Sequence, residues 1–325
     1  MGRRSGIFSI LWTTTLVLVA CSTDNSTVPE DREVPHDAPW GIYSLEVESG
    51  DVSLVYSSSA MLSGLFLSPS VEGFVFSERV GCDADSCEEI CSVNSDGSGF
   101  RQLTDNDSMD TYPCWSPDGS EIAYLSFGSG TLDIYVMNED GSDAHLLYDS
   151  GGHDADINWV GDRIVFTRNS QIWMMESDGS YDHQITNPPR AGEWGNANLP
   201  FGDYDPRLSP NGSTILFSRL VDDASQHGNY DFYAIGRDGS NEHALTNNGY
   251  TQGLSQWSRS GDQIVFVVAA IDDVGMYDLY LMDADGSNSH SITPAYFPET
   301  FLCRSATFSV DGRTIYFIGQ WFDQS

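Results

Sequence analysis

The chain has 325 residues, and its 40% hydrophobic and 12% aromatic content suffices for a packed core, which excludes the disordered class. Its 48 acidic residues oppose 14 basic residues, all of them Arg, for a formal net charge of -34. A field this negative repels phosphate backbones and argues against nucleic acid as a partner. Two explanations for the acidity stay open: adaptation to high external salt, or a site for a cation or a cationic partner.

The first twenty residues predict a signal peptide. Arg3 and Arg4 precede an uncharged apolar segment, Ile7 to Ala20, that is short for a transmembrane span. The sequence Leu18-Val19-Ala20-Cys21 resembles the lipobox of bacterial lipoproteins. This resemblance implies cleavage before Cys21 and a lipid on its thiol, so that the protein is exported and anchored in the bacterial cell envelope. The alternative is an ordinary signal peptide followed by a chance Cys.

Residues 21–39 are polar and contain several Pro and acidic residues, which is typical of a flexible tether. Residues 40–325 are expected to form the folded domain.

Two turn signals alternate along this domain. The first is Trp115-Ser116-Pro117-Asp118-Gly119, and the second ends in Asp140-Gly141-Ser142 after a strand that begins at Asp133. The pair recurs in stronger or weaker form over residues 67–98, 159–180, 209–240, 257–287 and, as a half copy, 308–317. Asp-Gly turns favour tight hairpins, and the short β-branched and aromatic segments between them predict strands. Segments such as Ile164-Val165-Phe166 are apolar on both faces, so a sheet must cover each side.

The last copy stops near Phe322, and its missing half lies at the start of the domain. Gly41 to Val47 aligns with the strand that begins at Asp133, and Val52 to Tyr56 supplies the final strand. The sequence therefore predicts an all-β fold: a six-bladed β-propeller of four-stranded antiparallel blades, its last blade closed by the N-terminal strands. Tyr43 is expected beside the sheet that contains Ile315 to Phe317.

Taken together, these copies resemble the repeat of the TolB-type propeller family, over residues 40 to 322. The resemblance implies the propeller fold and an inclination toward protein interaction. TolB itself carries an α/β domain before its propeller, whereas this chain has only the predicted tether there. The role of TolB in the Tol–Pal system is therefore not carried over.

The loops that lead into each inner strand are acidic and aromatic, and one of them, residues 188–205, is long. In a propeller such loops surround one end of the central channel. The candidate ligand-binding residues are Asp110, His153, Asp154, Asp156, Trp194, Phe201, Asp203, Tyr204 and Asp205. Their carboxylates suit Ca²⁺ or a cationic ligand or peptide. A merely solvated acidic rim is the alternative.

Other chemistry-bearing residues point to structure. His145, His183, His243 and His290 each lie four residues after an Asp-Gly glycine, which places them far apart on successive blades. An exported protein favours disulfides, and Cys82–Cys87 and Cys91–Cys114 are conceivable pairs, with Cys303 left over. Sequence does not determine the pairing.

No motif of a catalytic triad, a zinc protease or a phosphate loop is found in the sequence. The leading hypothesis is a monomeric, lipid-anchored propeller that binds a protein or peptide through the loops preceding its inner strands. One alternative is a metal-dependent lyase or hydrolase that uses axial carboxylates. Another is a glycan-binding module with Trp194, Phe201 and Tyr204 as stacking surfaces.

Overall fold

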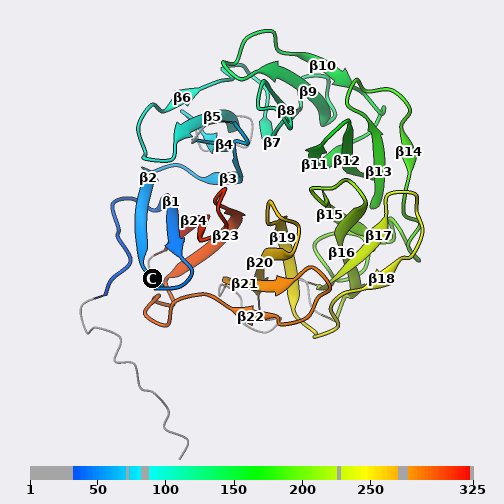
Figure 1. Ribbon diagram of the computed structural model, residues 1–325. Helices are drawn as coiled ribbons and strands as arrows, with labels where there is room; N and C mark the ends of the chain where they lie inside the picture. The colour runs from blue at the N-terminus through cyan, green and yellow to red at the C-terminus, as the bar shows by residue number, and fades with distance from the viewer. Residues whose placement is uncertain (1–31, 71–72, 82–87, 225–227, 270–276, 323–325) are drawn as a thin grey trace, which may run out of the picture. The chain divides into compact units, whose positions relative to one another are not determined.

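The computed structural model describes residues 32–70, 73–81, 88–224, 228–269 and 277–322. Residues 33–325 form one compact unit. Its described part contains 24 strands and no helix, and therefore no helix that could cross a membrane (Figure 1). The predicted signal peptide, Cys21, Cys82 and Cys87 lie outside the described residues.

The strands occupy four positions, counted outward from the centre of the unit (Figure 1). The inner strands are β3 (Leu62–Leu67), β7 (Asp110–Trp115), β11 (Asp154–Val160), β15 (Asp203–Leu208), β19 (Thr251–Trp257) and β23 (Phe301–Phe308). The second strands are β4 (Gly73–Arg79), β8 (Glu121–Ser126), β12 (Arg163–Arg168), β16 (Thr214–Asp222), β20 (Gln263–Ala269) and β24 (Thr314–Trp321).

The third strands are β5 (Glu88–Asn94), β9 (Asp133–Asn138), β13 (Gln171–Glu176), β17 (Asn229–Gly236), β21 (Tyr277–Asp283) and β1 (Trp40–Glu46). The outer strands are β6 (Arg101–Gln102), β10 (His145–Tyr148), β14 (His183–Gln184), β18 (His243–Ala244), β22 (His290–Ser291) and β2 (Val52–Ser58).

Four of the sheets are four-stranded and antiparallel, as predicted. A fifth sheet has eight strands and is mixed, because one parallel pair, Tyr230 with Thr251, joins β17 to β19. Side chains reinforce this junction: the Thr251 hydroxyl donates to the carbonyl of Gly228 over 2.7 Å, and Gln252 Nε2 donates to the carbonyl of Tyr230. This link was not expected from the repeat.

The two ends of the domain share one sheet, and this prediction is confirmed. Strand β1 lies between β2 and β24, with Tyr43 paired to Phe317. The Tyr43 ring is fully buried and stacks on Phe317 at 5.6 Å, while its hydroxyl accepts a hydrogen bond from Trp321 Nε1. Pairing the ends in this way covers the edges that both strands would otherwise expose.

Packing between neighbouring sheets explains why the second strands are apolar on both faces. Six hydrophobic clusters each join one set of four consecutive positions, inner to outer, to the neighbouring set, and together they run once around the centre of the unit. Phe76, Phe166, Phe217, Phe266 and Phe317 occupy equivalent positions and are fully buried. Burial of each such side chain contributes about 2–3 kcal/mol.

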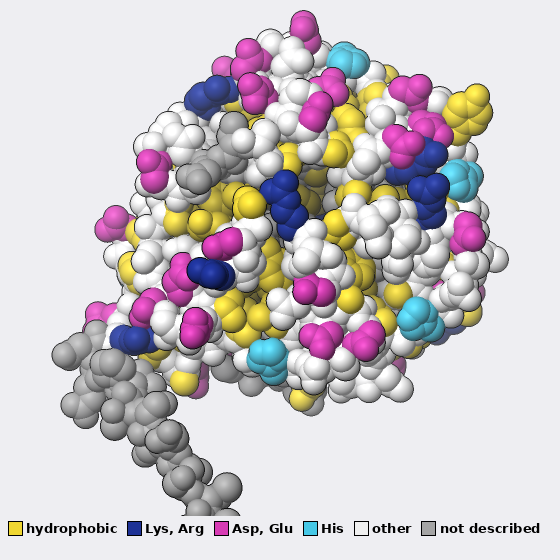
Figure 2. Space-filling view, in the orientation of Figure 1, with side chains coloured by type: hydrophobic (Ala, Val, Ile, Leu, Met, Phe, Trp, Pro, Cys, Tyr) yellow, Lys and Arg dark blue, Asp and Glu magenta, His cyan; other side chains and the backbone are white. Residues whose placement is uncertain are grey.

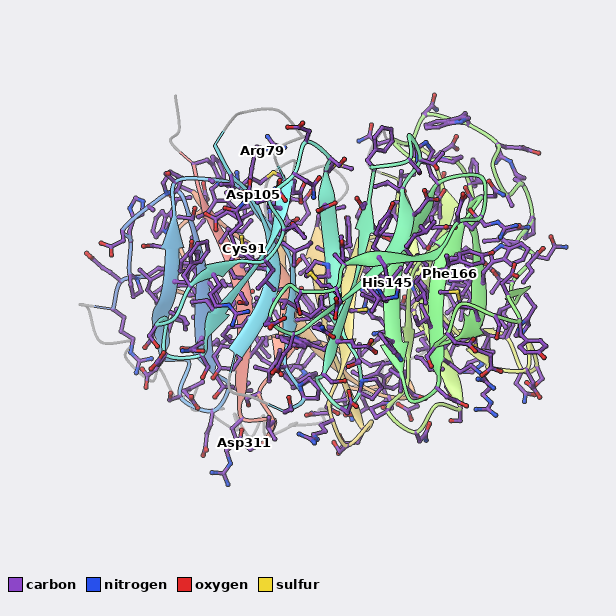
Figure 3. All side chains as sticks on the ribbon, turned by 90° about the horizontal axis from the view of Figure 1, so that it is seen from above. Arg79, Cys91, Asp105, His145, Phe166 and Asp311 are labelled. Carbon is purple, nitrogen blue, oxygen red and sulfur yellow. The ribbon has the colours of Figure 1, made fainter. Side chains whose placement is uncertain are left out.

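The repeated turns show why Ser, Asp and Gly recur at fixed spacing. Gly119 has a φ of 75°, which a side chain disfavours. Asp118 Oδ1 accepts hydrogen bonds from the Ser116 hydroxyl and from the Ser120 amide. These turns lie together on one side of the unit, which we call the turn face. Figures 1 and 2 look directly at this face, and Figure 3 shows it at the side where Asp311 is labelled. The loops into the inner strands form the opposite edge, the loop face, where Figure 3 labels Asp105.

Packing extends into the segment predicted as a tether. Val34 is buried in the cluster around Tyr43, the Tyr43 hydroxyl donates to the carbonyl of Pro35, and His36 stacks on Trp321 at 4.2 Å. The compact unit therefore includes these residues and begins before residue 40.

The prediction that Cys91 and Cys114 could form a disulfide is wrong. Cys91, Cys114 and Cys303 are free and buried, and each packs in a different hydrophobic cluster. They behave as small apolar side chains, because their positions in the repeat are core positions. Burial raises the pKa of each thiol, that of Cys114 to about 12, and keeps it protonated.

Candidate functional site

Each inner strand is interrupted by a bulge shortly after it leaves the loop face. The register shifts at the same place in all inner strands. A left-handed residue marks each bulge, with φ between 37° and 62°: Gly64, Tyr112, Asp156, Asp205, Leu254 and Ser305. Only the first of these is a glycine, so side chains at the bulges are held in strained backbone around the centre of the unit.

Three predicted site residues occupy one equivalent position, two residues before the bulge. Asp110, Asp154 and Asp203 all have fully buried side chains. Each lies within its own sheet, so the three carboxylates do not gather at one open site. Asp203 forms a bidentate pair with Arg219, over 2.6 and 2.9 Å, and Asp110 accepts from Asn106 Nδ2 over 2.7 Å.

Asp154 differs from its two counterparts, because neither of its carboxylate oxygens has a hydrogen-bond partner. Its strand partner Arg168 instead contacts the Tyr148 hydroxyl at 2.8 Å and Asp182 at 3.5 Å, and lies over the Trp173 ring. Burial raises the pKa of Asp154 to about 7. The carboxyl group is thus poised to titrate near neutral pH.

Asp156 and Asp205 connect neighbouring inner strands. Asp156 Oδ2 accepts a hydrogen bond from the amide of Asp205, and Asp205 Oδ2 accepts one from the amide of Ser255. The bulges free these amides, and the carboxylate of the preceding strand satisfies each one. Burial, and then the charge of Asp205, raise the pKa of Asp156. Two of the predicted ligand carboxylates therefore hold the sheets together.

Arg207 is the counterion of Asp156 and Asp205, which we call the axial pair, and it was not predicted from the sequence as a site residue. It is buried, its Nη2 lies 2.6 Å from Asp205 Oδ1, and its Nε donates to the carbonyl of Ser255. A sequence feature that could have identified it is its position in an inner strand, two residues after the bulge at Asp205. Burial and the charges of Asp156 and Asp205 raise the pKa of nearby Tyr112, so its phenol stays neutral.

The long loop over residues 188–202 is ordered. Phe201 is buried with Ala197, and its amide and carbonyl bond to Glu193 and Gly192 over 2.9 and 2.8 Å. Arg190 lies 3.6 Å over the Phe201 ring. Phe201 thus anchors the loop, whereas Trp194 is 71% exposed at its surface.

His153 and Tyr204 lie on the same loop face and are fixed by backbone groups. The exposed His153 accepts the Leu132 amide on Nδ1 over 3.1 Å and stacks on Phe127, which is also exposed. Tyr204 is half-buried, and its hydroxyl donates to the carbonyl of Pro200 over 2.6 Å. Within the described residues, no group of three His, Cys, Asp or Glu is placed to hold a metal ion.

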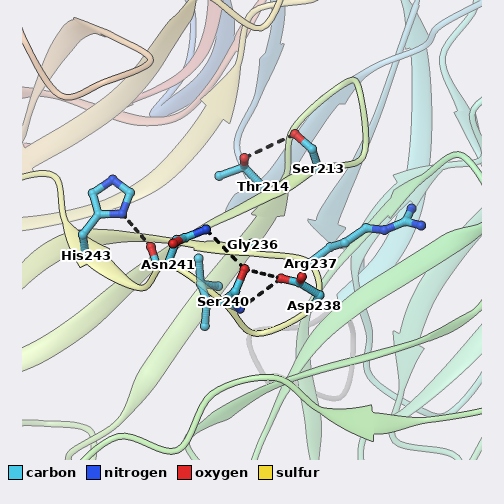
Figure 4. A pocket seen from close by; sticks show the side chains of 9 residues that line it. Ser213, Thr214, Gly236, Arg237, Asp238, Ser240, Asn241 and His243 are labelled. Carbon is cyan, nitrogen blue, oxygen red and sulfur yellow. Dashed lines mark hydrogen bonds between the residues drawn. The ribbon is translucent and has the colours of Figure 1, made fainter.

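The four repeated histidines lie on separate outer strands, as predicted. In each, Nδ1 contacts the carbonyl two residues earlier, as His243 contacts Asn241 over 2.8 Å (Figure 4). A carbonyl only accepts, so Nδ1 carries the proton. A shallow cavity of about 400 Å³ beside His243 is lined mainly by this turn and by Arg237.

The fold and the carboxylate-linked inner strands define a protein of the β-propeller class. The family model described as the TolB beta propeller domain matches residues 39–260, and the chain belongs to this family. An uncharacterised protein of Agrobacterium fabrum is 28% identical over 165 residues, which cover 47% of this chain and 53% of that protein. A TolB homologue of Chlorobium luteolum is 26% identical over 135 residues, 40% of this chain and 28% of its own. The chain thus spans about half or less of these relatives.

A solved structure named as TolB, from Agrobacterium tumefaciens, shares the fold. The TM-score is 0.65 at 17% identity, with 88% of this chain and 99% of that chain covered.

Proposed function

We propose that this chain is an exported, lipid-anchored propeller of six blades that binds a protein or peptide on its loop face. The blade count takes β15–β18 and β19–β22 as two blades, since one parallel pair joins them. Membership of the TolB propeller family supports a binding role. The observation that carries the proposal is the ordered loop that presents Trp194.

An exposed Trp on a fixed loop is suited to binding. Its large ring supplies contact area, and the anchoring by Phe201 means that little further ordering is needed when a partner binds. Leu199, Val221 and Tyr250 are also exposed, on this loop or on neighbouring strand ends and loops of the same face. Together they offer an apolar surface in an otherwise acidic protein.

Replacing Trp194 with Ala is expected to reduce capture of the partner from native cell envelopes at least tenfold, because loss of a central aromatic contact costs about 2 kcal/mol or more. Quantitative mass spectrometry of captured proteins measures this. Tyr181→Ala is the matched control, since Tyr181 is 82% exposed but lies on the turn face. Equal capture by the parent protein and the Trp194 variant would remove the support for a loop-face site.

The lipid anchor is proposed from the sequence around Cys21. Cys21→Ser should prevent lipid attachment and move the protein from the membrane fraction to the soluble fraction after cell disruption. Incorporation of a radiolabelled fatty acid provides the direct measurement. A variant that stays labelled and sediments with membranes would contradict the anchor without touching the binding proposal.

A further inference from the structure

The turn face has a cavity of its own, at its centre. It has a volume of about 310 Å³ and lies where the inner strands end, on the side opposite Trp194. Figure 2 shows hydrophobic side chains gathered around the hollow middle of this face. The apolar side chains that line this axial pocket include Leu67, Trp159, Leu208, Trp257, Phe308 and Val310.

The aromatic walls of the axial pocket have no polar group left to satisfy. Trp257 Nε1 donates to the carbonyl of Arg207 over 3.0 Å, and Trp159 Nε1 donates to that of Gly161 over 3.3 Å. With both indole N–H groups occupied, the rings offer only apolar surface. Val310 at the rim is 56% exposed. Apolar surface gathered in a concave site favours an apolar occupant.

The turns just outside the lining of the axial pocket form an acidic rim, in which Asp262 and Asp311 accept hydrogen bonds from two Ser side chains of the lining. Asp118, Asp262 and Asp311 lie in the turns that follow the inner strands, and hydrogen bonds from neighbouring Ser side chains and backbone amides lower their pKa values, that of Asp118 to about 2. All three are therefore ionised at physiological pH. Arg259 is the one cation among the described residues that line the pocket. This arrangement attracts a basic partner and repels anionic lipid headgroups.

We propose that the axial pocket receives an apolar side chain from a basic polypeptide segment, such as a Leu or Phe flanked by Lys or Arg. The apolar walls select the inserted side chain, and the ionised rim selects the charge beside it. This site goes beyond the loop-face function, because it uses the opposite face and no residue of the loop that presents Trp194.

The test titrates mature protein with a capped Arg-Arg-Leu-Arg-Arg peptide and follows tryptophan fluorescence, since two Trp line the pocket. A saturable change is expected, at least tenfold weaker for a peptide with Ser in place of Leu, and absent for one with Glu in place of Arg. Salt should weaken the binding, because the rim charges are exposed. No change up to about 1 mM peptide, where binding free energy is only about -4 kcal/mol, would overturn the proposal.

Variants assign the response to the pocket. Val310→Arg should weaken binding at least tenfold by bulk and charge, whereas Arg259→Ser should strengthen it several-fold by removing the opposing cation. Both residues are exposed, so folding should be preserved, which thermal melting checks. Tyr181→Ser, on the same face, and Trp194→Ala, on the other, should leave the affinity unchanged.

Three results would refute the site: unaltered binding by the Val310 variant, equal binding of the Glu-flanked peptide, or a response to anionic vesicles instead of the basic peptide. A negative peptide titration would not affect the proposal of binding through Trp194 on the loop face. A negative capture experiment with the Trp194 variant would likewise not affect the proposal for the axial pocket.

Discussion

Replacing Arg207 with Met is expected to lower the free energy of unfolding by about 3–5 kcal/mol, because it leaves buried carboxylates without their cation. Arg207 pairs with Asp205 at 2.6 Å and also donates to the backbone of Ser255. Asp156 lies next to this pair, since its carboxylate accepts a hydrogen bond from the backbone amide of Asp205. A methionine fills similar volume, so the loss reports on charge rather than on a cavity.

Urea denaturation of the mature protein measures this loss. The matched control, Arg237→Met, removes an exposed guanidinium on the turn face and should leave the midpoint unchanged. The double variant Arg207→Met/Asp205→Asn should recover part of the stability, because one of the two uncompensated carboxylates is neutralised and only Asp156 remains. A midpoint for Arg207→Met within error of the parent would mean that the axial ion pair does not hold the sheets together.

Asp154 should make the protein less stable as the pH rises from about 4 to about 7. Burial raises the pKa of its carboxyl group from 3.8 to about 7, and the charges of Asp133 and Asp149 add to the rise, while the charge of Arg168 opposes it. The folded state therefore binds the proton more tightly than the unfolded chain. The stabilisation is fully present below pH 4 and is lost as the pH passes through 7. Its upper bound is about 4 kcal/mol.

Comparison with Asp154→Asn isolates this effect from other titrating groups. The variant keeps the shape but carries no charge, so its thermal midpoint relative to the parent should rise between pH 4 and pH 8. Asp203→Asn is the comparison with a paired carboxylate: it removes the bidentate partner of Arg219 and should destabilise the protein at neutral pH. A constant difference between the Asp154 variant and the parent across this range would contradict the pKa assignment.

The periodic features were predictable from the sequence. Turns built from Ser, Asp and Gly and strands apolar on both faces recur at fixed spacing, and each reflects a local requirement that every repeat meets separately. The pairing of Tyr43 with Phe317 followed from the same periodicity, since a half copy at one end needed its complement. The equivalent positions of the four histidines followed for the same reason.

The candidate site was less predictable, because its properties come from contacts between repeats. Acidic residues at the bulges suggest an open ligand site, yet Asp156 and Asp205 bond to backbone amides of the next strand. Whether Phe201 or Trp194 faces solvent depends on the hydrogen bonds that close their loop. The axial pocket arises from residues contributed by five of the inner strands and the turns after the inner strands, which no single copy of the repeat reveals.

The sheet shared by the first and last strands of the domain also affects the order in which the strands can pair during folding. The Thr314 hydroxyl in β24 donates a hydrogen bond to the Glu46 carboxylate in β1, and the two residues are 268 positions apart. Synthesis is vectorial, so the first hairpin emerges long before the strand that will cover it, and closing so large a loop is slow. Until β24 is available, β1 is an unpaired edge strand that can pair with a wrong strand. We therefore expect closure of the ring to be a late step of folding, because it has to close a very long loop.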